Sequence, residues 1–383
     1  METSILSHFG IIKDPRINRR KLHRLVDILA ITIVGGVCGA EGFEDIETIA
    51  HAKEEWLRKF LQLPHGIPSH DTINRVISRI KPEQLQACFT SWVKAIFEAS
   101  DGEVIAIDGK TARRSFDKGN AVGEGHGAIH MVSAWASKAG ICLGQVKTNE
   151  KSNEITAIPE LLRVLDIKGC IVTIDAMGCQ KKIAKQIIEQ KGDYVLALKD
   201  NQANLAQCVE TSFEQAAARD NIGLEYSRVQ DVDKGHGRIE TRIVETLGEL
   251  SWLDDSQSWP GLESICKVTS IRESNKGTST ETRYFISSVH GEGAGQKIAE
   301  AVRRHWGIEN SLHWVLDVSF NEDQSRIRRG SGAENFATLR RISLNLLKGQ
   351  RAADHKIASK RGIKARKKLC GWDNRYLSQV LAG

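Results

Sequence analysis

Two short segments of this sequence end in the same way, and they constrain its fold more than any other feature. Each is a run of mostly β-branched apolar residues that stops at one aspartate: Val104–Ile107 precedes Asp108, and Ile171–Ile174 precedes Asp175. Such runs are typical of buried strands. In open α/β sheets, ligands bind at the carboxyl ends of the strands. The sequence therefore predicts an α/β fold with two carboxylates at one sheet edge, although either aspartate alone could simply cap a turn.

The segments around these aspartates predict the order strand, strand, strand, helix, strand, helix, strand. This is the order of a ribonuclease H-like core, although other α/β folds share it. The expected strands are 104–107, 130–136, 141–148, 170–174 and 194–198, and the expected helices are 154–165 and 180–190.

The regions on either side of this core have different patterns. Residues 16–100 have helical spacing, which fits a helix-turn-helix or a plain helical subdomain. After a helix that ends near residue 218, alternating segments at 225–229, 238–247, 265–271 and 283–289 predict a mainly β insertion, and a long helix over 295–317 returns to the core. We therefore expect a helical N-terminal domain at 1–100, the α/β core at 101–203 and 291–350, the insertion at 204–290, and a basic C-terminal tail at 351–383.

The charge of the chain is unevenly distributed. Its net charge is +6, but residues 324–383 hold fifteen Lys and Arg against three acids, or +12, and the remainder is −6. A second basic cluster near the start consists of Lys13, Arg16, Arg19, Arg20, Lys21 and Arg24. A polyanion such as nucleic acid is the natural partner of such regions.

Other classes of protein fit the sequence less well. The apolar stretch from Ile28 to Ala40 contains Gly35 and Gly36 and is shorter than the roughly 20 residues that cross a bilayer, so we expect a buried helix there and no membrane association. The start of the chain lacks the pattern of a signal peptide. None of the eight cysteines forms a Cys-x-x-Cys pair. These features predict a cytoplasmic protein with reduced thiols.

A third acid, Glu309, is expected on the helix that returns to the core. Chemistry alone does not distinguish it from Glu300, Asp317, Glu322 or Asp323. His305 and His313 share its helix face, at i−4 and i+4. A zinc site is possible there, but the His-Glu-x-x-His order of zinc peptidases is absent. Two strand-end aspartates and a glutamate are instead suited to a pair of Mg²⁺ ions, which prefer oxygen ligands.

Several motifs together resemble the DDE transposases of bacterial insertion sequences, in particular the ISAs-type group that includes the H-repeat-associated proteins. The resemblance covers nearly the whole chain, and residues 8–95 are similar to the helical domain that precedes the catalytic core in this group. Its motifs are Ile107-Asp108-Gly109-Lys110, Thr173 to Gln180, Leu198 to Gln202, Arg304 to Asn310, Leu312-His313-Trp314, Leu316-Asp317-Val318, Phe320-Asn321-Glu322-Asp323 and the helix from Asn335 to Leu347.

The resemblance implies a catalytic triad of Asp108, Asp175 and Glu309 that binds two Mg²⁺ ions, for which Mn²⁺ can substitute. It implies cleavage at the terminal inverted repeats of a mobile element, attack of the freed 3′-hydroxyl on target DNA, and a homodimer that holds two ends. The wider family often carries Tyr, Arg and Lys around the glutamate, whereas Val302, His305 and Leu316 occupy the corresponding positions here. The residues that we expect to contact DNA are Lys110, Lys199, Arg238, Arg304, His305, Arg326, Arg328 and Arg329.

Two alternatives share much of this pattern. A stranded copy of the element would keep the fold and DNA binding but not transposition. A host nuclease of the same fold would share the metal chemistry but would recognise no dedicated end sequence.

Overall fold

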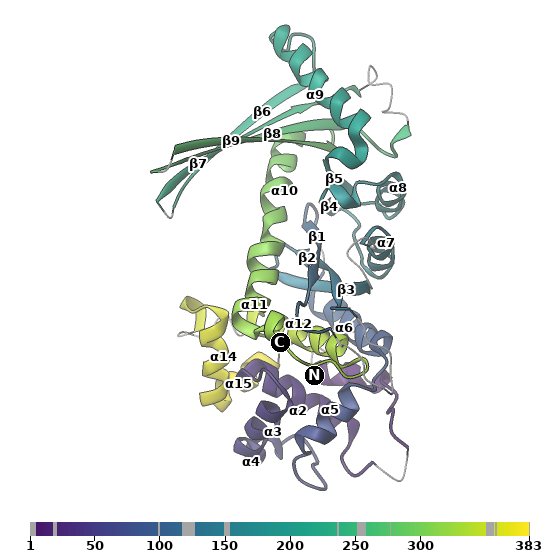
Figure 1. Ribbon diagram of the computed structural model, residues 1–383, viewed down its shortest axis with the longest axis vertical. Coiled ribbons are helices and arrows are strands. Elements are labelled where there is room, and N and C mark those ends of the chain that lie inside the picture. The colour runs from purple at the N-terminus through teal and green to yellow at the C-terminus, as the bar shows by residue number, and fades with distance from the viewer. Residues whose placement is uncertain are drawn as a thin grey trace.

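The computed structural model describes residues 5–17, 21–98, 100–116, 127–148, 154–235, 237–250, 258–275, 277–349, 356 and 358–382. Arg19, Arg20 and Arg351, which belong to the basic regions noted above, lie outside these residues. The molecule is elongated, with one large sheet in its upper part and a group of helices below it (Figure 1). It is therefore a mixed α/β structure, as the sequence predicted.

One nine-stranded sheet runs through the upper part in the order β3-β2-β1-β4-β5-β9-β8-β7-β6. Strands β1, β4 and β5 are parallel, whereas β2 is antiparallel to β1 and β3, and β9 is antiparallel to β5. The strands are β1 (Val104–Thr111), β2 (His130–Ala136), β3 (Ile141–Thr148), β4 (Ile171–Ile174), β5 (Asp193–Leu198), β6 (Tyr226–Gly235), β7 (Arg238–Leu247), β8 (Ser264–Ser274) and β9 (Gly277–Ser287).

Helices cover both faces of this sheet (Figure 1). Helices α7 and α8 pack on one face, and the long helix α10 crosses the other face and contacts β1 and β4. The helical elements of this part are α7 (Glu154–Val164), η4 (Ala176–Gly178), α8 (Lys181–Glu189), η5 (Asp200–Gln202), α9 (Ala203–Ala218), α10 (Ala294–Ile308), the π-helical segment η8 (Glu309–His313), α11 (Trp314–Phe320) and η9 (Glu322–Gln324).

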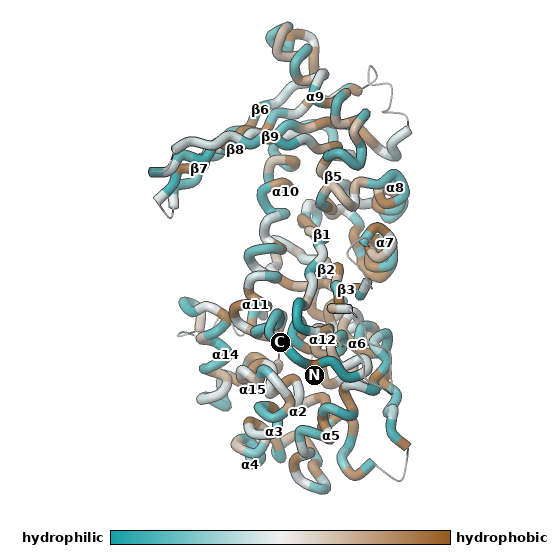
Figure 2. Tube along the Cα trace, viewed as in Figure 1, coloured by the Kyte–Doolittle hydropathy of each residue, from teal (hydrophilic) through white to brown (hydrophobic). Residues whose placement is uncertain are grey.

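The segment expected as a β insertion is built from α9 and the strands β6 to β9. These strands continue the core sheet, because β9 pairs with β5 from Val195↔Ser287 to Leu198↔Tyr284. Strands β6, β8 and β9 are longer than the sequence pattern suggested, whereas β7 has the expected bounds, and their distal ends are exposed and mostly hydrophilic (Figure 2). Polar side chains on both faces hide the alternation there, which is why the ends of these strands were hard to predict.

The N-terminal and C-terminal helices pack together in the lower part of the molecule (Figure 1). The basic C-terminal segment is thus folded, and α14 packs against α2 and α12. These elements are α1 (Ile5–His8), η1 (Phe9–Ile11), α2 (Leu25–Cys38), α3 (Phe43–Ala52), α4 (Glu54–Leu57), α5 (His70–Ile77), α6 (Pro82–Ile96), α12 (Gly332–Lys348), η10 (Ala358–Lys360), α14 (Ile363–Trp372) and α15 (Asn374–Leu381).

The apolar stretch near the N-terminus forms the buried helix α2, as expected. Its two adjacent glycines allow close packing, because a Cβ on Gly36 would overlap Ser343 of α12 and one on Gly35 would crowd Ile46 of α3. Among the described residues, no single helix is long and apolar enough to cross a bilayer; α2 and α3 pass that test only as a pair, and the chain bends by 94° between them.

Helix α12 joins the lower helices to the sheet. Its buried polar side chains are hydrogen-bonded to both parts: Asn335 donates to the carbonyls of Ile77 and Ile80, and Asn345 accepts from and donates to the backbone of Cys142 on β3. Buried amides without such partners would be destabilising. The helix therefore fixes the N-terminal helices against the sheet that carries the candidate site.

Candidate active site

Asp108 and Asp175 lie on neighbouring strands, although β1 continues to Thr111 and does not end at Asp108 as the sequence pattern predicted. The parallel register pairs Ile107 of β1 with Ile174 of β4, so that Asp108 and Asp175 follow at adjacent positions of neighbouring strands. Asp175 also accepts a hydrogen bond from the backbone N–H of Gly178 at 3.3 Å and caps the short helix η4. Asp175 thus caps a helix, which the sequence left open, and also lies at the edge of the sheet.

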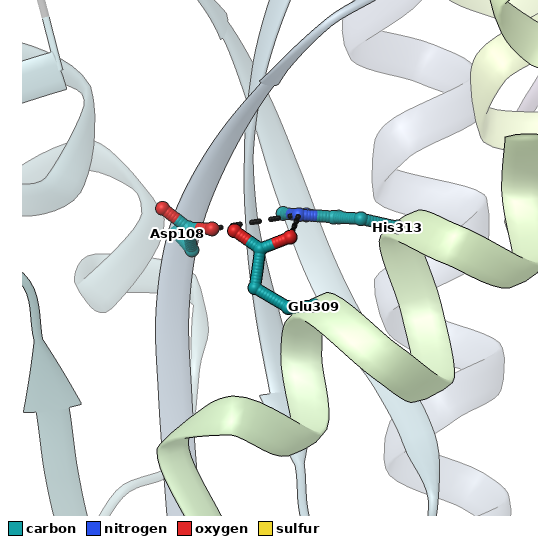
Figure 3. A group of neighbouring side chains, drawn as sticks. All are labelled: Asp108, Glu309 and His313. Carbon is teal, nitrogen blue, oxygen red and sulfur yellow. Dashed lines mark ion pairs between the residues drawn. The ribbon is translucent and has the colours of Figure 1, made fainter. Parts of the chain in front are cut away.

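Glu309 reaches Asp108 from the helix that crosses the sheet (Figure 3). It begins the π-helical segment η8, and His313 ends it. The Nδ1 atom of His313 lies 3.4 Å from Asp108 Oδ2 and 3.6 Å from Glu309 Oε2. One ligand atom from each of these three residues can be chosen so that all lie within 4.8 Å of one another. The helix therefore brings a carboxylate and an imidazole to the first aspartate.

The carboxylates perturb one another's protonation. Burial raises the pKa of Asp108 to about 8, and the neighbouring Glu309 and Asp175 carboxylates act in the same direction. The contact with His313 lowers the pKa of Glu309 to about 2. Like charges in a partly buried site disfavour joint ionisation unless a proton or a cation compensates them. This donor set of clustered carboxylates is chemically suited to divalent cations.

A cavity of about 740 Å³ opens in front of these side chains. Asp108, Asp175 and Glu309 line it. The lining also includes an arginine wall from β7, β8, β9 and α10, with the basic side chains Arg238, Arg242, Arg272, Arg283 and Arg303. Arg238 was expected to contact DNA, whereas Arg272 and Arg283 were not foreseen, because only strand pairing brings them beside it. Arg303, which comes from α10, was not foreseen either.

Arginines of this wall surround one carboxylate. Arg242 Nη2 donates to Glu240 Oε1 at 2.8 Å, and the guanidinium groups of Arg272 and Arg238 lie 3.7 and 3.8 Å from Glu240. Burial raises the pKa of Glu240, but the three arginines lower it, and the net shift of this pKa is downward. The Glu240 carboxylate thus contacts arginine side chains that could otherwise bind a phosphate group.

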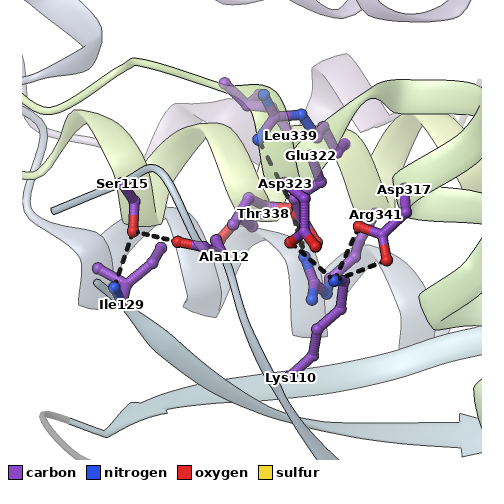
Figure 4. Close-up of polar contacts among 12 residues, drawn as sticks. Lys110, Ala112, Ser115, Ile129, Asp317, Glu322, Asp323, Thr338, Leu339 and Arg341 are labelled. Atoms are coloured by element: carbon purple, nitrogen blue, oxygen red, sulfur yellow. Dashed lines mark hydrogen bonds and ion pairs between the residues drawn. The ribbon is translucent and has the colours of Figure 1, made fainter.

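Lys110, expected at the DNA, instead makes ion pairs inside the protein. Its Nζ lies 2.8 Å from Asp317 and 3.2 Å from Asp323, and its side chain is 9% exposed (Figure 4). Behind it, the buried Glu322 accepts a hydrogen bond from Arg341 at 3.1 Å. These contacts give the acids after Glu309 a structural role, because they attach α11 and η9 to β1 and α12.

His305 and Arg304 also have partners within the protein. His305 Nδ1 lies 2.9 Å from the Thr173 hydroxyl, and burial lowers the pKa of His305 to about 4, so its ring is neutral at pH 7. Arg304 donates to Glu300 at 2.6 Å. Lys199 is exposed and lines the cavity beside Asp175. Of these three residues, Lys199 has the surroundings best suited to phosphate contact.

The other expected DNA-binding residues precede α12. Arg326 and Arg329 are exposed, whereas Arg328 is half-buried, donates to the carbonyl of Arg114 at 3.0 Å and packs 4.8 Å from the ring centre of Phe116. They do not line the cavity that contains the three acids. The structure therefore separates them from Arg238 and Lys199.

The basic C-terminal region is less exposed than its charge suggested. Arg340, Arg341 and Lys367 are buried, and Lys367 donates to the carbonyl of Ser319. Arg366 donates to backbone carbonyls, including that of Leu347 at 2.8 Å. The residues that remain exposed in the described part of this region, besides Arg326 and Arg329, are Lys356, Lys360, Arg361, Lys364, Lys368 and Arg375. Sequence alone could not separate the buried basic residues of this region from the exposed ones.

Comparisons with known proteins agree with this geometry. Residues 99–346 match the family model described as the transposase DDE domain, and residues 6–93 match that of the domain associated with it. Over 99% of this chain, it is 43% identical to "Putative transposase YncI" of Escherichia coli O157:H7 and 41% identical to "H repeat-associated putative transposase YhhI" of Escherichia coli (strain K12), covering 94% and 98% of those proteins.

Proposed function

Because this chain belongs to the DDE transposase family, and is therefore a metal-dependent DNA-cutting enzyme, we propose that it acts at the terminal inverted repeats of an insertion sequence. In this proposal it cuts the DNA at the element ends and joins the freed 3′-hydroxyl to target DNA. The observation that carries the proposal is the convergence of Asp108, Asp175 and Glu309 on one cavity whose lining is also rich in arginine. A stranded or inactive copy would not need to keep the three acids together.

We propose that residues 101–203 and 291–350 form a ribonuclease H-like core. The strand order β3-β2-β1-β4-β5, with β2 antiparallel to its neighbours and β1, β4 and β5 parallel, supports this assignment. In such an arrangement β1 is the central strand, and both β4 and α10 contact it. The position of Asp108 therefore makes it the central acid of the site.

In this proposal the triad coordinates two Mg²⁺ ions, for which Mn²⁺ can substitute. Asp108, whose carboxyl interacts with both other acids, would hold both ions, whereas Asp175 and Glu309 would each hold one. When bound, the ions activate the attacking oxygen and stabilise the leaving oxygen of the phosphodiester. The raised pKa of Asp108 supports this assignment, since a cation would replace the proton that relieves the repulsion between the carboxylates.

Double-stranded DNA fits the cavity by charge. The arginine wall and the acids line the same cavity, so a phosphate backbone bound there would contact Arg238, Arg272 or Arg283 with its scissile bond near Asp108. Lys199 adds positive charge at the cavity, and the exposed lysines of α14 add it outside the cavity. We expect two copies of the chain to hold the two element ends, as a homodimer.

The test is strand cleavage of a DNA that carries the flanking repeats of the gene, with Mg²⁺ or Mn²⁺. Glu309→Gln should abolish cleavage and leave end binding intact, because it removes a metal ligand without changing size. Glu300→Gln is the matched control, since Glu300 lies on the same helix but pairs with Arg304.

Three outcomes separate the candidate functions. Cleavage at the repeat ends that is lost in Glu309→Gln supports the transposase. End binding without any cleavage by the wild type favours a stranded DNA-binding copy, and cleavage without preference for the repeats favours a host nuclease. Full activity of Glu309→Gln would contradict the proposed triad.

A further inference from the structure

We propose that His313 is a direct metal ligand, so that one of the two cation positions has an aspartate, glutamate and histidine donor set that binds transition-metal ions such as Mn²⁺ more tightly than Mg²⁺. The inference rests on the proposed function, because it assigns a fourth residue to the same metal site. Neither the three acids nor their spacing in the sequence implies this residue.

The distances around His313 favour metal coordination over hydrogen bonding. Its Nδ1 atom lies 3.4 Å from Asp108 Oδ2 and 3.6 Å from Glu309 Oε2. An N–H···O hydrogen bond is about 2.7–3.2 Å long. By contrast, two ligand atoms that lie about 2.1 Å from one ion are about 3.0 Å apart at the 90° angle of an octahedral site and about 3.4 Å apart at the tetrahedral angle. The two separations from His313 are thus close to those of ligands around a shared cation.

The position of the imidazole supports the same conclusion. Figure 3 shows the ring directed at the two carboxylates, with Nδ1 as the atom that faces both. The side chain of His313 is 6% exposed, and among the described residues its other nitrogen, Nε2, has no hydrogen-bond partner. Packing therefore holds the ring in place, and the polar surroundings of this buried side chain are concentrated on the side of the carboxylates.

The local helix geometry explains how two residues of one helix reach the same point. Glu309 and His313 are the first and last residues of the π-helical segment, which is flanked by α10 and α11. Single π-helical turns inside α-helices are frequent at functional sites. Residues four apart share one helix face, so Glu309 and His313 both face β1, and α11 places Asp317 against Lys110.

A nitrogen ligand changes which ions the site prefers. Mg²⁺ requires near-octahedral oxygen ligands and keeps several waters, whereas imidazole is a ligand of transition metals. His305, the other histidine on this helix face, is hydrogen-bonded to Thr173 instead. Only His313, of these two, has a ring nitrogen directed at both Asp108 and Glu309.

The experiment is pulsed electron paramagnetic resonance of the full-length protein with one equivalent of Mn²⁺. A directly bound imidazole gives a ¹⁴N coupling to the Mn²⁺ electron spin, which reports ligation without any catalytic assay. We expect the coupling in the wild type, its loss in His313→Gln, and its retention in the matched control His305→Gln. Titration should show Mn²⁺ affinity falling at least tenfold in His313→Gln and Mg²⁺ affinity falling less.

Each other outcome has a definite meaning. Mn²⁺ bound by the wild type without ¹⁴N coupling overturns the role of His313 and leaves the acid triad standing, and this result needs no variant. Coupling lost in His305→Gln but kept in His313→Gln also overturns it. Mn²⁺ binding that is unaffected by Asp108→Asn would instead contradict the proposed metal site, and the assignment of His313 with it.

Discussion

Replacing Lys110 by methionine should destabilise the protein and leave its DNA binding nearly unchanged. The change keeps the length of the side chain but removes the cation between Asp317 and Asp323. Asp323 retains Arg113 at 3.2 Å, so Asp317 is the acid that loses its partner. Breaking a buried ion pair costs about 3–5 kcal/mol and an exposed one about 0–1 kcal/mol. Because Lys110 is 9% and Asp317 34% exposed, we expect a loss of about 2 kcal/mol.

Thermal unfolding measures this loss. With an unfolding entropy of about 2.1 cal/mol/K per residue, a 383-residue chain should lose about 2–3 °C in Tm. The double variant Lys110→Met/Asp317→Asn should recover part of the loss, because the neutral amide needs no cation. If Lys110→Met keeps the wild-type Tm but lowers the slope of log K against log salt by about 0.9, Lys110 contacts a phosphate and the structural argument is wrong.

Two further predictions concern charge in the cavity. Without metal, the wild type should lose stability as the pH rises from about 4 to about 8, because Asp108 holds a proton in the folded state that the unfolded chain has released. Asp108→Asn should flatten this pH dependence in thermal melts, and parallel curves for the two proteins would refute the prediction. Glu240→Gln should strengthen DNA binding and steepen the slope of log K against log salt by up to about 0.9, because three arginines lose the carboxylate that they now contact. Unchanged binding in fluorescence anisotropy would exclude the arginine wall from the DNA interface.

The sequence predicted the core elements well because their signals are local. Strands such as Val104–Ile107 are continuous apolar runs, and a buried run between polar boundaries is readily recognised. The long helix that returns to the core was also confirmed, although its π-helical segment was not foreseen. The pattern over residues 295–317 was interpreted as one uninterrupted α-helix, whereas the structure has a π-helical segment at Glu309–His313.

The parts of the site that the sequence missed depend on pairing between distant segments. Arg272 and Arg283 join the cavity because β7 pairs with β8 and β8 with β9, and no motif marks either residue. Lys110 was grouped with DNA contacts because its charge was visible, whereas its partners Asp317 and Asp323 are more than 200 residues away in the chain. Charge counts likewise could not show that Lys367 is buried.

The continuity of the sheet from β4 through β5 to β9 has a mechanical consequence. Backbone hydrogen bonds, rather than a flexible linker, connect the strand that precedes Asp175 to the strands that carry the arginine wall. The distance between wall and acids is therefore set by strand spacing and cannot be adjusted by a hinge. If DNA is cut and then joined in this one cavity, the bending and rotation needed between the two steps must come mainly from the DNA.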